Sequence, residues 1–148
     1  MKNRRWMIAT GFAIAVLAGT LGIRASIAQP AAKPAAAPPG FKRVELNRHD
    51  SSNPGHEVVM ARAEFDPGGA VPKHTHPGEE VAYVLEGEIT LEVDGKPAQH
   101  LKTGDSFYLP GGTVHAAKNT GKGGAKVLAT YIVEKGKPLA TPVGVPPK

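Results

Sequence analysis

Short apolar runs separated by frequent turn-forming residues are the feature that most constrains the fold of this chain. The sequence contains 18 glycines and 14 prolines among its 148 residues. Turn clusters such as Asp66-Pro67-Gly68-Gly69 recur between the apolar runs, and no segment of residues 41–134 carries sustained helical periodicity. This pattern predicts many short strands joined by turns, and therefore an all-β sandwich or closed barrel.

Several apolar runs have the periodicity or composition of strands. In residues 89–93, Ile89, Leu91 and Val93 alternate with polar residues, and a turn-forming Asp-Gly pair follows them. Residues 81–85 (VAYVL) are apolar on both faces, so we expect a strand that is buried on both sides. The other predicted strands are residues 56–65, 97–101, 106–109, 114–119 and 126–134.

The N-terminal segment has the pattern of an export signal. A basic start at residues 1–5 precedes the uncharged stretch 6–23, and the small residues Ser26 and Ala28 favour cleavage after Ala28. Paired arginines in the basic start also resemble a twin-arginine signal, and an uncleaved membrane anchor is the alternative. We therefore predict a signal peptide at residues 1–28 and a periplasmic or secreted protein without stable membrane association.

Composition divides the rest of the chain into three parts. We assign residues 29–40 to a Pro/Ala-rich linker, residues 41–135 to the folded domain and residues 136–148 to an extended tail, in which Leu139 and Val143 can pack on the domain. The net charge of +5 comes mostly from the predicted signal peptide, because the remainder carries 14 basic and 13 acidic residues. This near balance argues against nucleic acid as a partner. The absence of cysteine excludes disulfides, thiolate ligands and a cysteine nucleophile.

Three histidines and a glutamate are candidate metal ligands. His74 and His76 are two positions apart, so on an extended segment their side chains point to the same side. Glu80 precedes an apolar run, where a buried carboxylate requires a compensating cation. His115 follows a turn. Three imidazoles and a carboxylate suit one divalent ion such as Fe, Mn, Co, Ni, Cu or Zn.

The spacing of these residues resembles the two motifs of the cupin superfamily, over about residues 56–134. The first motif, G-x5-H-x-H-x3-E-x6-G, is met by Gly68, His74, His76, Glu80 and Gly87. The second, G-x5-P-x-G-x2-H-x3-N, is met by Gly104, Pro110, Gly112, His115 and Asn119. The resemblance implies a cupin-type double-stranded β-helix, or jelly-roll barrel, with one metal ion in its mouth.

In that family the four candidate residues are the metal ligands, so the resemblance implies that His74, His76, Glu80 and His115 bind one divalent transition metal (Fe, Mn, Ni, Cu or Zn). The motif spacing favours Glu80 over its neighbour Glu79 as the carboxylate. We expect the remaining histidines, and Lys73 unless it meets an anionic substrate, to lie at the surface. Candidates for lining the pocket or packing in the core are Tyr83, Phe107, Tyr108 and Tyr131.

The resemblance leaves three functions open, since cupin barrels carry many activities. The leading hypothesis is an oxygenase similar to the quercetin-dioxygenase-like small cupins, acting on a small enol, diol or aromatic substrate, with Glu80 as both ligand and catalytic proton acceptor. The alternatives are a non-catalytic periplasmic protein that binds a metal or small ligand, and a metal-dependent isomerase or decarboxylase. Because small cupins commonly dimerise through sheet edges or strand exchange, we also expect a homodimer.

Overall fold

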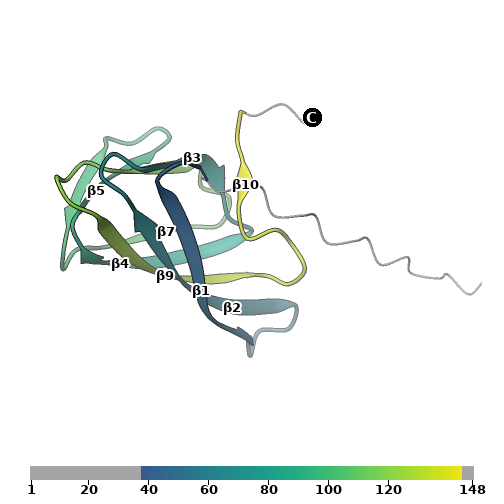
Figure 1. Cartoon of the computed structure of the whole chain (residues 1–148). Helices are drawn as coiled ribbons and strands as arrows, with labels where there is room; N and C mark the ends of the chain where they lie inside the picture. Colours follow the sequence, from purple (N-terminus) through teal and green to yellow (C-terminus); the bar gives the residue numbers. More distant parts are fainter. Residues whose placement is uncertain (1–37, 145–148) are drawn as a thin grey trace, which may run out of the picture. The chain divides into compact units, whose positions relative to one another are not determined.

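The computed structural model describes residues 38–144, which form ten strands in two sheets (Figure 1). The strands are β1 (Phe41–Asp50), β2 (His56–Phe65), β3 (Ala70–Thr75), β4 (Gly78–Glu86), β5 (Glu88–Val93), β6 (Gln99–Lys102), β7 (Ser106–Leu109), β8 (His115–Asn119), β9 (Ala125–Glu134) and β10 (Thr141–Pro142). Residues 38–144 contain no helix, and hence none that is long and apolar enough to cross a membrane. The predicted signal peptide and most of the predicted linker lie outside the described residues.

Each sheet contains five antiparallel strands drawn from distant parts of the chain. The order is β1-β2-β9-β4-β7 in the first sheet, which we call sheet A, and β10-β3-β8-β5-β6 in the second, sheet B. Strands remote in sequence pair in register, such as β2 with β9 and β3 with β8. Two such sheets facing each other form a jelly roll, which confirms the predicted all-β barrel.

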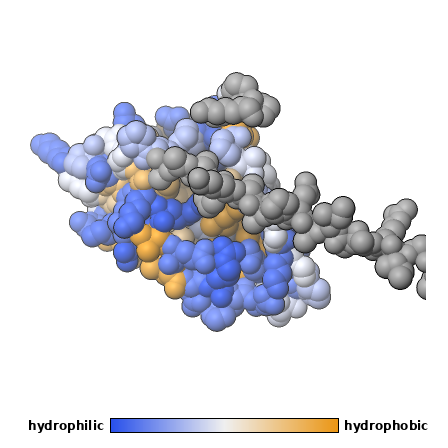
Figure 2. Space-filling model, turned by 45° about the vertical axis from the view of Figure 1, so that its right-hand side comes forward, coloured by the Kyte–Doolittle hydropathy of each residue, from blue (hydrophilic) through white to orange (hydrophobic). Residues whose placement is uncertain are grey.

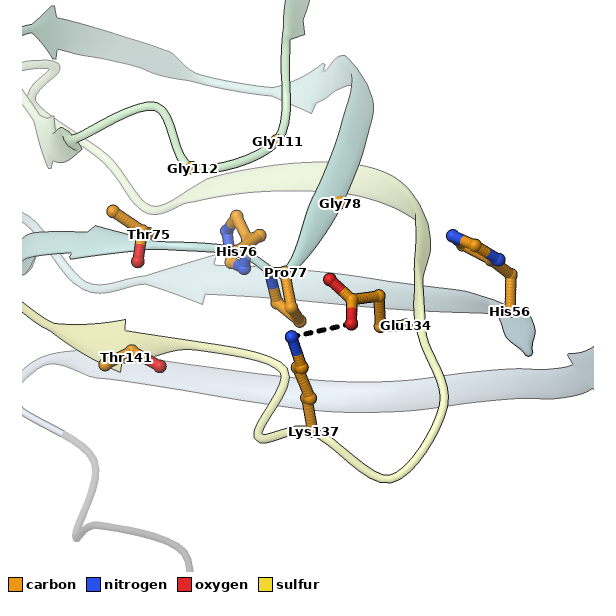
Figure 3. A pocket seen from close by; sticks show the side chains of 10 residues that line it. All are labelled: His56, Thr75, His76, Pro77, Gly78, Gly111, Gly112, Glu134, Lys137 and Thr141. Carbon is orange, nitrogen blue, oxygen red and sulfur yellow. Dashed lines mark ion pairs between the residues drawn. The ribbon is translucent and has the colours of Figure 1, made fainter.

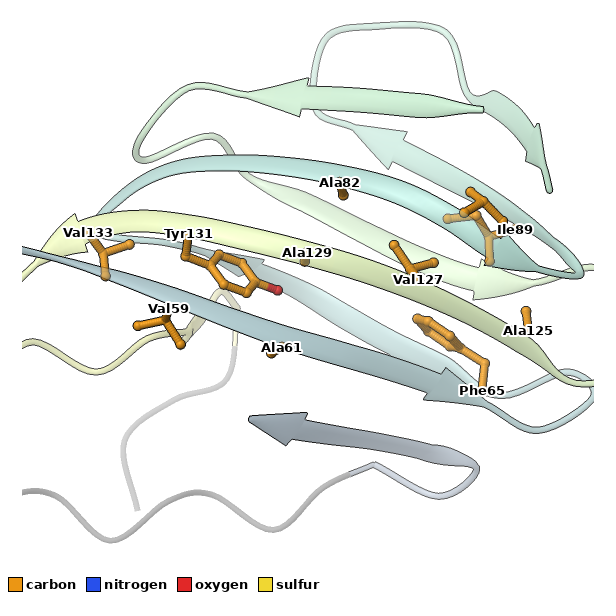
Figure 4. Close-up of a cluster of buried hydrophobic side chains, with 11 residues drawn as sticks. Val59, Ala61, Phe65, Ala82, Ile89, Ala125, Val127, Ala129, Tyr131 and Val133 are labelled. Atoms are coloured by element: carbon orange, nitrogen blue, oxygen red, sulfur yellow. The ribbon is translucent and has the colours of Figure 1, made fainter. Parts of the chain in front are cut away.

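The core lies between the sheets and follows from period-two alternation. Along β9, Val127, Ala129, Tyr131 and Val133 are buried, while the residues between them are half-buried or exposed. These side chains pack with Phe65 and others in one hydrophobic cluster (Figure 4). Only one face of each strand therefore contributes to the barrel interior.

Asn119 holds the loops at one end of the barrel together. Its side chain is 1% exposed, and its amide nitrogen donates hydrogen bonds to the carbonyl oxygens of Asp66 and Gly123 at 3.0 and 2.7 Å, with a longer contact of 3.4 Å to that of Phe65. Its side-chain oxygen accepts a bond of 2.9 Å from the Gly121 N–H. The last residue of the second sequence motif thus satisfies backbone groups of two loops that have no strand partner.

The C-terminal segment after β9 crosses back over the barrel. Leu139 packs against the hydrophobic core, and β10 pairs with β3. The backbone N–H of Val143 donates to the Lys73 carbonyl, although the Val143 side chain stays exposed. This segment, which we call the strap (residues 136–143), brings Leu139 and Ala140 to the predicted metal ligands.

The strand predictions need correction. The strands β1, β3 and β10 were not predicted, and a bulge between Glu45 and Asn47 interrupts the alternation of β1. The strand predicted at 97–101 begins later, at Gln99. The run 81–85 is buried on one face only, because the alternate side chains point away from the barrel, including the exposed Tyr83.

Polar residues dominate much of the surface. Hydrophilic residues cover most of the face shown in Figure 2, and hydrophobic residues form smaller patches between them. Ion pairs such as Lys126–Glu86 and Lys73–Asp94 are solvent-exposed. Exposed pairs contribute little to folding, so burial between the sheets supplies most of the stabilisation.

Candidate metal centre

The four predicted ligands lie together inside the barrel, although they come from separate stretches of chain. His74 is in β3 and His76 directly follows this strand, Glu80 is in β4 and His115 begins β8. The β3–β8 register places His74 opposite His115, while Glu80 faces them from sheet A. All four side chains are buried, with residue exposures between 4% and 8%.

The nitrogen and oxygen atoms converge on one point. Ligand atoms of His74, His76 and His115 lie within 4.8 Å of one another, the arrangement expected of a group that can hold a metal ion. The Glu80 Oε2 atom is 3.3 Å from His76 Nε2 and 3.4 Å from His115 Nε2. The structure therefore brings three imidazoles and one carboxylate to a common centre.

Hydrogen bonds from the other ring nitrogen fix the orientation of each imidazole. His74 Nδ1 bonds to the Pro72 carbonyl at 2.8 Å and His115 Nδ1 to the Thr113 carbonyl at 2.9 Å. His76 Nδ1 bonds to the carbonyl of Leu139 in the strap. Since a carbonyl accepts, each Nδ1 carries a proton, so each ring in its neutral form presents the Nε2 lone pair to the centre, as in histidine metal sites.

Two atoms at the centre lack the partners that buried polar atoms normally have. Among residues 38–144, neither His76 Nε2 nor Glu80 Oε2 has a hydrogen-bond partner, because their short contact lacks hydrogen-bond geometry. Buried polar atoms without partners cost free energy, and a cation at this point would remove that cost. The residues present therefore fit a bound divalent metal.

The electrostatics of the cluster are those of an anionic carboxylate among imidazoles. Burial raises the pKa of Glu80, but the neighbouring His115 and His76 outweigh it and bring the pKa to about 2. Burial lowers the pKa of His74 to about 4. Burial also lowers the pKa of His115, yet Glu80 and the Thr113 carbonyl together raise it above its usual value. At neutral pH the cluster thus offers an ionised carboxylate and at least one neutral imidazole, both suited to a cation.

Tyr131 closes one side of the cluster. Its ring centroid lies 4.6 Å from that of His76, and the β4–β9 register places it opposite Glu80. Burial, reinforced by the Glu80 carboxylate, raises the pKa of Tyr131 well above its usual value, and the Arg43 guanidinium opposes this rise. The hydroxyl is therefore protonated at neutral pH.

Two cavities adjoin the centre. The inner cavity, of about 60 Å³, is lined by His74, Glu80, His115 and mainly apolar side chains of the barrel. The outer cavity, of about 460 Å³, contains His76 but none of the other three, and the ion pair Glu134–Lys137 lies at its edge (Figure 3). The inner cavity is the smaller one, but a molecule bound there would meet three of the four predicted ligands.

The other candidate residues fall into two groups, those that line the inner cavity and those that lie away from the metal centre. Phe107 and Tyr131 line the inner cavity, whereas Tyr83 and Tyr108 are exposed on the outside of sheet A. The Tyr108 hydroxyl donates to Glu79, which accordingly lies outside the barrel, unlike Glu80. Lys73 forms an ion pair with Asp94, and His49, His56 and His100 lie outside the cluster.

Arg43 is a residue that the sequence analysis did not single out. It lies in β1 and lines the inner cavity. The available signal was its spacing from Phe41, which is two positions earlier and also lines the cavity. Without a predicted strand at this position, that spacing indicated nothing.

Comparison with known proteins places the chain among cupins. The family described as "Cupin domain" matches residues 61–144. Germin-like protein subfamily 2 member 2 of Arabidopsis thaliana is 42% identical over 79 residues, which are 50% of this chain and 36% of the relative. The rhicadhesin receptor of Pisum sativum is 38% identical over 79 residues, again 50% of this chain and 36% of the relative. The matched region thus spans about a third of the length of these curated relatives.

Solved structures give the same result. An oxalate oxidase in complex with the substrate analogue glycolate has a TM-score of 0.59 and 27% identity, covering 73% of this chain and 57% of that chain. An RmlC-like cupin from Shewanella frigidimarina has a TM-score of 0.52 and 28% identity, covering 65% of this chain and 78% of that chain. The shared region includes the barrel that surrounds the candidate metal centre.

Proposed function

Because this chain belongs to the cupin family, we propose that His74, His76, Glu80 and His115 bind one divalent transition metal, and that this site is the catalytic centre of an oxygenase-type enzyme. The observation that carries the proposal is the convergence of buried ligand atoms, two of which have no other partner among residues 38–144. Fe, Mn, Co, Ni, Cu and Zn all suit three imidazoles and a carboxylate. When bound, such an ion would polarise an oxygen of the substrate and, if redox-active, engage dioxygen.

The residues that line the inner cavity limit the size of the substrate and include a group that can accept a proton from it. The Glu80 carboxylate, with a pKa of about 2, is ionised at neutral pH and suited to bind the cation. A carboxylate with so low a pKa is a weak base, so Glu80 would accept a proton only from a substrate hydroxyl that the metal makes acidic. Apolar walls, including Phe107 and Leu91, exclude water from the reacting atoms. Since the cavity measures only about 60 Å³, it favours a small enol or diol over a large aromatic substrate.

The similar oxalate oxidase supports redox chemistry on a small substrate, because it was solved with the substrate analogue glycolate and is 27% identical. Two other activities share the same metal centre. A binding protein would hold the metal or a small ligand without turnover, and an isomerase or decarboxylase would use the metal as a Lewis acid. The small, mostly closed cavity is compatible with a substrate of few atoms in each case.

Metal analysis and oxygen consumption test the proposal. The apo protein is loaded separately with Fe²⁺, Mn²⁺, Co²⁺, Ni²⁺, Cu²⁺ and Zn²⁺, and we expect one ion per chain by mass spectrometry. His115→Ala and Glu80→Ala should lower this stoichiometry, whereas the control His49→Ala, outside the cluster, should retain it. Loaded protein should consume oxygen with a small diol or β-diketone. Metal binding without oxygen consumption would reject the oxygenase and leave the binding protein, whereas turnover without oxygen would favour the Lewis-acid enzyme.

We further propose that the protein is a homodimer formed through the outer face of sheet A. Val81, Tyr83 and Leu85 of β4 and Tyr108 of β7 are each between 42% and 54% exposed, and Tyr108 pairs with Val81 across the strands. Together they expose roughly 300–400 Å² of largely apolar side chain. This is up to about half of the ~800 Å² per partner of a stable interface, and the half-buried side chains beside these residues would have to supply the rest.

Light scattering after size exclusion tests the dimer. We expect a dimer for the wild-type protein and a monomer for Tyr108→Glu, because a buried charge in the interface lacks a partner. The control Gln99→Glu, on β6 of sheet B, should remain dimeric. A monomeric wild-type protein at micromolar concentration would reject this interface.

The N-terminal predictions also stand as proposals, namely a signal peptide at residues 1–28 and a linker at residues 29–40, and hence a periplasmic or secreted protein. They are tested by the mass of the exported protein, which should begin at Gln29. An intact Met1 in a membrane fraction would favour the anchor instead.

A further inference from the structure

Arg43 projects from β1 towards the same cavity as the predicted metal ligands. β1 pairs with β2 so that Phe41 lies opposite Phe65 and Arg43 lies opposite Ala63, and all four line the inner cavity. Lys42, between them, belongs to the other face of the strand. Arg43 thus lies on the inward face of β1 beside Phe41, and further along this face are the charged residues Glu45 and Arg48, opposite the buried Ala61 and Val59.

The Arg48 hydrogen bond lowers the pKa of Glu45 and Arg43 helps to lower it, but Glu45 forms its ion pair with Arg48 and not with Arg43. Residues 38–144 contain three arginines, of which Arg48 pairs with Glu45 and Glu57, and Arg62 pairs with Glu64. Arg43 forms no ion pair with any carboxylate in this part of the chain. Arg43 lines the inner cavity and is exposed as a residue, so an anion from solution can reach it.

The inner cavity is shared by Arg43 and the metal centre. Its lining includes Arg43, Glu80 and Tyr131, and Tyr131 lies opposite Glu80 in the β4–β9 register. The rest of the lining is largely apolar and includes Phe41, Phe65 and Ala129. A small molecule in the cavity would therefore meet both a cation and the ligand cluster.

We propose that Arg43 binds a carboxylate group of the substrate, and that the substrate is a small carboxylic acid whose second oxygen function reaches the ligand cluster. A guanidinium binds a carboxylate through two parallel N–H···O bonds, a geometry that a lysine or an amide does not reproduce. The cavity of about 60 Å³ limits the substrate to a few carbon atoms, well below the ~300 Å³ of an ordinary ligand pocket. This inference rests on the proposed metal-dependent function, because it places the other end of the substrate at that centre.

Binding of small probes to the Co²⁺-loaded full chain tests the inference. The probes are glycolate, its neutral amide glycolamide, and inorganic phosphate, followed by calorimetry and by the visible spectrum of the Co²⁺ ion. We expect the wild-type protein to bind glycolate more tightly than glycolamide or phosphate. Arg43→Gln should weaken glycolate binding about 10- to 100-fold while leaving glycolamide binding unchanged. Arg43→Lys should lie between the two, since it keeps the charge but not the fork.

Lys42→Gln is the matched control, because it removes the same charge from the adjacent residue on the opposite face of β1. Glycolate binding should be unchanged in this variant, and the Co²⁺ content should equal one per chain in every variant. Equal affinity of wild type and Arg43→Gln for glycolate, or a preference for phosphate, would overturn the role of Arg43 without affecting the metal centre. If the wild-type protein bound no Co²⁺, the proposed function would fail. Calorimetry on the metal-free protein would then test the role of Arg43 by itself. Loss of glycolate binding in Arg43→Gln would support that role, and unchanged glycolate binding would reject it.

Discussion

Replacement of Asn119 by aspartate should destabilise the domain at least as much as replacement by alanine, although aspartate has nearly the same size. The Asn119 amide nitrogen donates to the carbonyl oxygens of Asp66 and Gly123, and its oxygen accepts from the Gly121 N–H. Aspartate keeps the acceptor but replaces the donor with an anionic oxygen that faces these carbonyl oxygens. The side chain is only 1% exposed, so water cannot replace the lost bonds.

The magnitude follows from the bonds that are lost. In Asn119→Ala, three good hydrogen bonds disappear, each worth about 1 kcal/mol net, for a total of about 3 kcal/mol. In a domain of about 100 residues this lowers the melting temperature by roughly 10–20 °C. In Asn119→Asp one bond remains, but a buried anion without a cationic partner costs several kcal/mol more.

Urea unfolding of the metal-free protein, followed by far-ultraviolet circular dichroism, measures both variants. The control is Asn47→Asp, which makes the same chemical change at an exposed position of β1 and should shift stability by less than about 0.5 kcal/mol. If Asn119→Asp matched the wild type within that margin, the hydrogen bonds around Asn119 would not be what stabilises these loops.

Two further predictions concern the strand that carries Glu80 and the protonation of the centre. Gly78→Ala should destabilise the domain by about 3 kcal/mol in urea unfolding, because a Cβ atom would lie 2.1 Å from the Ile132 carbonyl oxygen. The control Gly123→Ala, which has open space around it, should have little effect on stability. Equal stabilities of the two variants would refute the close approach of β4 to β9. Metal binding should release a proton near neutral pH and weaken as the pH falls, because the pKa of His115 is raised and the ring must lose its proton to act as a ligand. Calorimetry in buffers of different ionisation enthalpy measures this release, and a buffer-independent heat would contradict it.

The motif residues could be predicted because their spacing is fixed by local geometry. His74 and His76 share a face through the period of a strand, and the register of β3 with β8 brings His115 opposite His74. The carbonyl that orients His76 could not be predicted, because Leu139 is 63 residues away in sequence. Spacing identifies the residues of the cluster, whereas the groups that orient them depend on how the strap folds back.

Burial was the weaker part of the sequence prediction. An apolar run such as residues 81–85 has the same composition whether its second face meets another layer or the solvent. The alternation observed in β4 leaves Val81 and Tyr83 exposed, and the proposed contact with a second copy of the chain would bury them. The pattern of residues 81–85 therefore shows that the side chains are apolar and not that the protein interior buries them. The proposed dimer gives a physical reason for apolar side chains on the outer face of sheet A.

Metal chemistry and substrate choice reside in different stretches of this chain. The four proposed ligands lie within residues 61–144, the part that matches the cupin domain, whereas Arg43 and Phe41 come from β1, before that part begins. Because β1 lines the cavity and contributes no proposed ligand, a substitution at position 43 should change which anion binds while the coordination of the metal stays the same. Under the proposal made above, Arg43 of β1 is the residue of this chain that selects an acid.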